Sequence, residues 1–116
     1  MNINNSGRKI IVDVKKTSFL GRGLGLTFRT REARNLLFDF RRDTMTSITS
    51  FFVFFPFLAV WLDSNNKVID AEVIKPFRFM IKPSKKFRRL VEIPLTKKNA
   101  KTVEFFVGKG KSLNSL

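Results

Sequence analysis

The run of residues 48–62 constrains the fold of this chain more than any other part of its sequence. It reads ITSFFVFFPFLAVWL and is rich in β-branched and aromatic side chains, which favour strands. Pro56 cannot donate a hydrogen bond to a central ladder, so the run is predicted to break into strands over residues 50–55 and 57–63. Neither strand alternates with polar residues. Both are therefore expected at the buried centre of a sheet, with apolar neighbours on each face.

Turn and alternation signals predict further strands around this centre. The triplet SNN at residues 64–66 is a turn signal, so residues 67–74 are expected to form a hairpin with the preceding strand. Residues 9–15 (KIIVDVK) alternate with period two, which puts their aliphatic side chains on one face. Further strands are expected around residues 26–29, over 90–95 and over 102–107.

One segment has the periodicity of a helix. Thr30 is a suitable N-cap, and the apolar residues after it repeat at i, i+3, i+4 and i+7. These residues are Ala33, Leu36, Leu37 and Phe40. Residues 97–101 are expected to form a helical turn. The predicted fold class is all-β (mainly β), a compact barrel or sandwich with one or two short helices.

The length of 116 residues suits one domain, so residues 1–116 are predicted to share a single core. Residues 1–8 and 108–116 are predicted to be flexible basic ends. The start, MNINNSG, lacks the apolar stretch of a signal peptide. The longest apolar run, residues 51–62, is shorter than the roughly 20 residues that a membrane-spanning helix needs. We therefore expect a soluble, cytoplasmic protein without a membrane partner.

Charge is the strongest functional signal. The chain has 23 Lys and Arg against 9 Asp and Glu, a net charge of +14, whereas small soluble domains usually carry about 2 to 8. Residues 43–72 are mildly acidic, and the positive charge lies in the two flanks. A phosphate backbone would relieve the self-repulsion of so basic a protein, which favours nucleic acid as the partner.

The candidate contacts are the basic residues of the two flanks. In the N-terminal flank they are Arg8, Lys9, Lys15, Lys16, Arg22, Arg31, Arg34, Arg41 and Arg42. In the C-terminal flank they are Lys75, Arg78, Lys82, Lys85, Lys86, Arg88, Arg89, Lys97, Lys98, Lys101, Lys109 and Lys111. Phe77, Phe79 and Phe87 lie between these cations and could stack on unpaired bases, although large apolar side chains are more often buried in a core.

The chain lacks the residues that several classes of enzyme need. Without Cys and His the chain has no zinc-thiolate site, no thiol nucleophile and no histidine base. The GRGLG segment lacks the spacing of a nucleotide-binding loop. Asp63, Asp70 and Glu72 could hold Mg²⁺ or act as acid and base in a pocket, but a turn role and charge compensation are the simpler interpretations. We assign no catalytic residue, metal site or cofactor.

An ordered series of short motifs resembles the archaeal branch of the domain-of-unknown-function family numbered 192. The motifs occupy residues 25–29, 36–40, 52–56, 61–63, 68–70, 75–77 and 91–94. The resemblance implies a compact all-β domain and no particular activity. The chain departs from the family pattern at Thr49 and Ser50, at Leu58 and at Leu95 or Thr96. If the family has a small polar site there, these departures imply its loss and favour surface binding.

Together these features predict a non-enzymatic RNA-binding protein, a structural component of a ribonucleoprotein particle such as the ribosome. Its partners would be ribosomal RNA and neighbouring proteins of the same particle. Binding should depend on shape and phosphates, because no base-reading motif is present. Three alternatives remain at this point: a chromatin-type DNA-binding protein, a small-ligand-binding or enzymatic β-barrel, and a protein-interaction module that uses exposed Phe.

Overall fold

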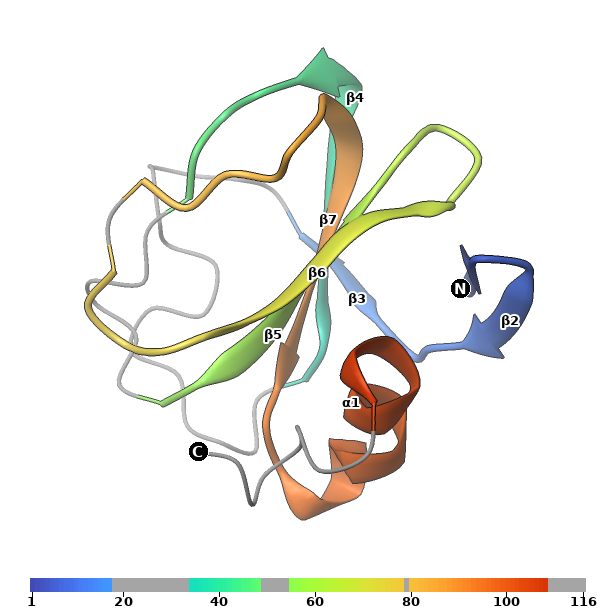
Figure 1. Cartoon of the computed structure of the whole chain (residues 1–116), viewed down its shortest axis with the longest axis vertical. Coiled ribbons are helices and arrows are strands. Elements are labelled where there is room, and N and C mark those ends of the chain that lie inside the picture. The colour runs from blue at the N-terminus through green and yellow to red at the C-terminus, as the bar shows by residue number, and fades with distance from the viewer. Residues whose placement is uncertain (18–33, 49–54, 79, 109–116) are drawn as a thin grey trace.

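The computed structural model describes residues 1–17, 34–48, 55–78 and 80–108. Its largest element is a five-stranded sheet of order β3-β4-β7-β5-β6, in which β3 and β4 are parallel and all other neighbours are antiparallel (Figure 1). The strands of this sheet are β3 (Lys15–Thr17), β4 (Leu36–Thr44), β5 (Phe57–Leu62), β6 (Val68–Ile74) and β7 (Phe87–Pro94). A two-stranded sheet contains β1 (Asn2–Asn5) and β2 (Arg8–Ile11), and a 3-10 turn, Lys97–Asn99, leads directly into helix α1 (Ala100–Val107).

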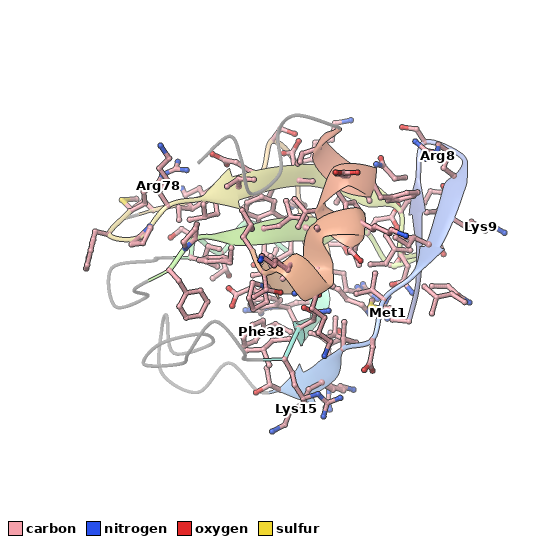
Figure 2. The ribbon with its side chains drawn as sticks, turned by 90° about the horizontal axis from the view of Figure 1, so that it is seen from below. Met1, Arg8, Lys9, Lys15, Phe38 and Arg78 are labelled. Carbon is pink, nitrogen blue, oxygen red and sulfur yellow. The ribbon has the colours of Figure 1, made fainter. Side chains whose placement is uncertain are left out.

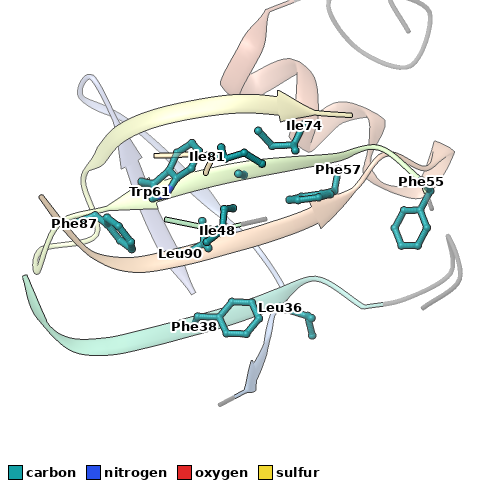
Figure 3. Packing of buried hydrophobic residues seen from close by; sticks show 11 residues of the cluster. Leu36, Phe38, Ile48, Phe55, Phe57, Trp61, Ile74, Ile81, Phe87 and Leu90 are labelled. Carbon is teal, nitrogen blue, oxygen red and sulfur yellow. The ribbon is translucent and has the colours of Figure 1, made fainter. Parts of the chain in front are cut away.

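The sheet is covered on both faces. Every residue of β5 is buried, and so is β7 from Leu90 to Pro94. On one face the rings of Phe38, Phe57 and Trp61 pack with residues of the connections between strands (Figure 3). Ile48 and Ile81 of those connections exchange two backbone hydrogen bonds of 2.9 and 2.8 Å.

The opposite face is covered by the β1–β2 hairpin and α1. Ile3 and Val12 from the N-terminal part and Val103 from α1 pack against Leu58 and Val60 of β5. Residue 1 is part of this cover, because the Met1 and Val12 backbones exchange hydrogen bonds of 3.0 and 2.9 Å. Residues from both ends of the described chain thus close this face of the sheet.

The predicted fold class is confirmed: the chain is mainly β with one short α-helix, in an arrangement consistent with a β-sandwich or barrel. The predicted strand at residues 57–63 is β5, and it forms the expected hairpin with β6. The strand predicted at 90–95 lies within β7 apart from its last residue, and the helical turn predicted at 97–101 is present. Neither helix among the described residues is long and apolar enough to cross a membrane.

The helix predicted after Thr30 is wrong where the structure describes it, because Leu36 begins strand β4. Leu36, Phe38 and Phe40 also alternate with period two, and this pattern fits the pairing of β4 with β7. Pairing places Leu36 opposite Glu92 and Phe38 opposite Leu90 on the buried face. Tertiary pairing therefore decides between two periodicities that the same residues satisfy.

The strand predicted over residues 102–107 is also wrong, because this segment belongs to α1. Val103, Phe106 and Val107 are spaced by three and four residues, so one helical turn presents all of them to the sheet. The β-branched and aromatic composition of the segment had favoured a strand, but the spacing of its apolar side chains suits a helix.

The N-terminal residues contribute strands to the fold. Of residues 1–8, which were predicted as an end, Asn2–Asn5 form β1 and Arg8 begins β2, and Ile3 is only 1% exposed. The single strand predicted over 9–15 is divided between β2 and the start of β3, which belong to different sheets. The strand predicted at 26–29, most of the strand predicted at 50–55, the glycine turn and residues 109–116 lie outside the described residues.

Burial predicts a large difference between two phenylalanines of the same segment. Phe87 is 0% exposed and meets Phe40 edge to face, with ring centroids 5.3 Å apart, whereas Phe77 is 55% exposed. We expect Phe87→Ala to lower the free energy of unfolding by about 3 to 5 kcal/mol and Phe77→Ala by less than about 0.5 kcal/mol. Urea denaturation followed by circular dichroism measures both changes. Equal losses would contradict the packing described here.

Candidate nucleic-acid interface

The predicted cations lie on several sides of the molecule. Figure 2 shows Arg8 and Lys9 on the hairpin at one end, Arg78 at the opposite end and Lys15 on a third side. The exposed ones are Arg8, Lys9, Lys15, Lys16, Arg34, Arg41, Arg42, Lys75, Arg78, Lys82, Lys85, Lys86, Lys97, Lys98 and Lys101. Arg88 and Arg89 are half-buried, while Arg22, Arg31, Lys109 and Lys111 lie outside the described residues.

Two asparagines join three distant segments at one end of the sheet. The Asn99 Nδ2 donates to the Oδ1 of Asn35 at 3.1 Å and to the carbonyl of Pro94 at 2.8 Å. The Asn35 Nδ2 donates to the carbonyl of Asp13 at 3.0 Å, and the Asn35 carbonyl accepts from Lys15 N at 2.8 Å. The bond from Asn99 to Pro94 is buried and the bond from Asn99 to Asn35 is partly buried, whereas the bond from Asn35 to Asp13 is exposed. They hold residues 13–16, 34–36 and 97–101 beside one another.

The junction of these segments gathers positive charge. Together they contain six basic residues and one acidic residue, a net charge of +5. We call the six the junction cluster: Lys15, Lys16, Arg34, Lys97, Lys98 and Lys101. The single acidic residue, Asp13, lies 3.8 Å from Arg34 in a highly exposed ion pair, which stabilises little and leaves the charge accessible. The first turn of α1 has no acidic residue, so the positive pole of the helix adds to the local potential.

Two arginines of the C-terminal flank are held by carboxylates. The Arg89 Nε donates to Asp39 at 3.1 Å, and its guanidinium also donates to the Ser64 carbonyl and the Asn66 side chain. Arg88 Nε lies 3.4 Å from Asp43 in an ion pair. These contacts tie β7 to β4 and to the β5–β6 turn. Arg88 and Arg89 therefore have structural roles in addition to any contact with a ligand.

The surroundings of the Asp39 carboxyl change its pKa. Burial works against its ionisation, but hydrogen bonds from the backbone of Arg41 and the side chain of Arg89, with the positive charge of Arg89, outweigh burial and lower its pKa. Asp39 is consequently ionised at neutral pH and remains a partner for Arg89.

The three carboxylates considered for a metal or acid–base site have separate partners. Asp63 accepts hydrogen bonds from the backbones of Asn65 and Lys67, at 2.8 and 2.9 Å, and so belongs to the turn as expected. Asp70 accepts from the backbone of Ser84, and Glu72 pairs with Arg78 at 2.8 Å. Among the described residues no three acidic side chains gather in a way that could hold a metal ion.

The three phenylalanines of the basic segment have different outcomes. Phe87 is fully buried, in agreement with the expectation that large apolar side chains lie in the core, so its ring is not available for stacking. Phe77 is 55% exposed and can meet a ligand. Phe79 lies outside the described residues.

Sequence reasoning missed a buried glutamate at the centre of the sheet. Glu92 is 5% exposed, lies opposite Leu36 and Ala59, and has an Oε1 atom without a hydrogen-bond partner. Burial raises the pKa of Glu92 to about 8. Trp61 follows Ala59 by two residues on β5 and so lies on the same face of the sheet, and its buried Nε1 has no hydrogen-bond partner. The signal in the sequence was the segment LVEIPL, in which Glu92 interrupts a strand that is apolar on both faces.

The chain is similar to a known protein over most of its length. It is 34% identical over 89 residues to a UPF0127 protein of Pyrococcus horikoshii, and the match covers 76% of this chain and 76% of that protein. No family model matches the sequence.

Two crystal structures share the fold. One is a candidate transcription regulator of Sinorhizobium meliloti, with a TM-score of 0.65 and 18% identity over 80% of this chain and 76% of that chain. The other is a protein of unknown function from Novosphingobium aromaticivorans, with a TM-score of 0.66 and 12% identity over 86% of this chain and 74% of that chain. At these identities the likeness concerns the fold alone.

The buried carboxyl makes stability depend on pH. Because the pKa of folded Glu92 is raised to about 8, the folded state holds its proton more tightly than the unfolded chain does. The resulting stability is fully present below about pH 4.5 and is lost as pH rises through 8. We expect Glu92→Gln to unfold at a higher temperature than the wild type at pH 9, with a free energy of unfolding that is larger by on the order of a few kcal/mol. This advantage should disappear toward pH 5.

Thermal unfolding across this pH range tests the Glu92 effect. Glu104→Gln makes the same chemical change on the partly exposed surface of α1 and serves as the control. Its unfolding profile should follow that of the wild type. A Glu92→Gln profile parallel to the wild type at every pH would contradict a raised pKa for Glu92.

Proposed function

The chain belongs to the UPF0127 family, and for this member we propose a non-enzymatic role in binding RNA, as a structural component of a ribonucleoprotein particle such as the ribosome. The site we propose for phosphate contact is the junction cluster. The RNA would then be ribosomal RNA, the neighbouring proteins of the particle would be further partners, and the place of action would be the cytoplasm. We also propose that the domain-of-unknown-function family numbered 192 and the UPF0127 family are the same family, since the motif series and the matched relative each span most of the chain.

The observation that carries this proposal is the unbalanced charge at the junction of three segments. The three described segments contain six exposed cations and one acidic residue, on a backbone held by buried and partly buried asparagine hydrogen bonds. Lys and Arg side chains bind phosphate as point charges and as bidentate donors. A rigid backbone keeps these charges at a fixed spacing, which suits a folded RNA surface better than an isolated basic tail does.

A DNA-binding role is the main alternative, because duplex DNA presents the same phosphate charge. The fold shared with the candidate transcription regulator does not favour it, because that likeness is too distant to carry a function. RNA is preferred because a small, highly basic domain with cations on several sides is typical of proteins embedded in RNA. Competition between structured RNA and duplex DNA of equal length separates the two functions.

Sedimentation of the native protein tests the particle assignment. We expect the protein in a gentle lysate to sediment with ribosomal particles and to move to the top of the gradient after ribonuclease digestion. An inactive ribonuclease preparation is the control. Sedimentation as a free protein in low salt, before any digestion, would contradict the proposed role.

Binding in vitro tests the junction cluster itself. We expect Lys97→Gln combined with Lys98→Gln to weaken RNA binding. The slope of the logarithm of the binding constant against the logarithm of the salt concentration should fall in magnitude by about one for each phosphate that the variant no longer neutralises. Fluorescence anisotropy with a structured RNA at several salt concentrations measures both quantities. Both side chains are exposed, so the fold should be unaffected.

A matched control separates this cluster from general charge attraction. Lys9→Gln combined with Lys67→Gln removes the same charge from β2 and from the end of the β5–β6 turn. Its loss of affinity should be smaller than that of the Lys97 and Lys98 variant. Equal losses would mean that total charge, rather than the junction cluster, determines binding.

A further inference from the structure

The connection between β6 and β7, residues 75–86, presents two large apolar side chains to solvent. Phe77 is 55% exposed and Met80 is 70% exposed. Both have a positive φ, 65° for Phe77 and 54° for Met80, a region that bulky residues seldom adopt. Such backbone outliers persist only where the surroundings hold them, and they are frequent at binding sites.

The rest of the connection is anchored to the body of the protein. Ile81 is buried and exchanges backbone hydrogen bonds with Ile48. Ser84 donates its backbone N–H to Asp70 of β6, and Arg78 forms an ion pair with Glu72 of the same strand. The segment that carries Phe77 is thus held between fixed points on both sides.

The charge of this connection is entirely positive. Residues 75–86 contain no Asp or Glu and five basic residues, which are Lys75, Arg78, Lys82, Lys85 and Lys86. Glu72 on the adjoining strand compensates one of them through its ion pair with Arg78. An exposed aromatic ring among several cations is complementary to a ligand that has both phosphates and flat bases.

Single-stranded RNA fits these features better than the other possible occupants. A stable protein interface needs roughly 800 Å² on each partner, much more than two projecting apolar side chains supply. Membrane-surface binding generally uses the apolar face of an amphipathic helix, and the described residues of this connection contain no helix. An unpaired base needs only one accessible ring face and a nearby cation for its phosphate.

We propose that Phe77 is a stacking platform for an unpaired RNA base, with Lys75 and Lys82 contacting the adjoining phosphates. This inference rests on the proposed RNA-binding function and adds a preference for single-stranded segments. The platform is separate from the junction cluster: Figure 2 places Arg78, next to Phe77, far from Lys15. The junction cluster would bind phosphates of paired and unpaired RNA alike, and Phe77 would discriminate between them.

The test compares a single-stranded RNA of about 12 nucleotides with an RNA duplex of the same length, each labelled with fluorescein. Phe77→Ala should lower affinity for the single strand about tenfold, as expected when one base is no longer stacked, and leave duplex binding unchanged. Phe77→Leu keeps an apolar side chain without a ring, so it should lose affinity similarly. Phe77→Trp should retain binding, and its fluorescence should be quenched by the single strand. The other tryptophan of the chain, Trp61, is buried.

Each adverse result has a distinct meaning. Wild-type affinity of Phe77→Ala for the single strand overturns the stacking proposal. Wild-type affinity of Phe77→Leu also overturns it, because contact would then need only an apolar surface. If the Lys97 and Lys98 variant loses affinity for both RNAs while Phe77→Ala loses none, RNA binding stands and stacking fails. Failure of the wild-type protein to bind either RNA ends both proposals. If Phe77→Ala weakens binding to anionic phospholipid vesicles and does not change RNA binding, the exposed apolar side chains belong to a membrane-binding surface instead.

Discussion

Burial of β5 and β7 on both faces is the constraint from which the rest of this structure follows. A strand such as FLAVWL has no polar face to turn toward water, so each side of the sheet must be covered by other parts of the chain. On one face Ile3 and Val103, a hundred residues apart, supply the cover. The requirement to cover this face brings α1 back to the sheet and places the 3-10 turn with Lys97 and Lys98 beside the start of β4. The junction cluster is therefore a consequence of how the core is closed.

The use of the few acidic residues explains where positive charge is left over. Asp39 and Asp43 pair with Arg89 and Arg88 at the far end of β4, where these arginines are half-buried and an unpaired charge would be costly. Other carboxylates cap a turn or hold the β6–β7 connection. Within the three described segments of the junction, Asp13 is the one acidic residue, and its side chain is 91% exposed. In the described segments of the junction, six basic residues thus outnumber one acidic residue, which leaves a local excess of positive charge.

The sequence predicted the parts of this fold that depend on local composition. Residues of β5 and the β5–β6 hairpin could be recognised because burial on both faces and turn chemistry are visible in a short window. Leu36 and its neighbours could not be assigned, because their apolar side chains satisfy a helical and a strand period at once and only the pairing with β7 selects the strand. The cations of the candidate site could be named but not grouped. Their grouping depends on the hydrogen bond between Asn35 and Asn99, 64 residues apart, and on ion pairs that no local pattern reveals.

Two positions at which the sequence departs from the motif pattern it resembles lie in the core of this sheet. Leu58 and Leu95 are 0% and 3% exposed and belong to the same apolar cluster beneath the hairpin and α1. A carboxylate at position 58 would need a buried partner, whereas leucine packs there without one. These two positions of the resemblance are therefore apolar and buried in this chain, and neither contributes to a polar site. On the opposite face Glu92 is buried with an unpartnered oxygen, and burial favours its neutral form up to about pH 8. A buried neutral carboxyl offers a substrate much less than the exposed cations offer a polyanion, which is why we place function on the surface of this protein.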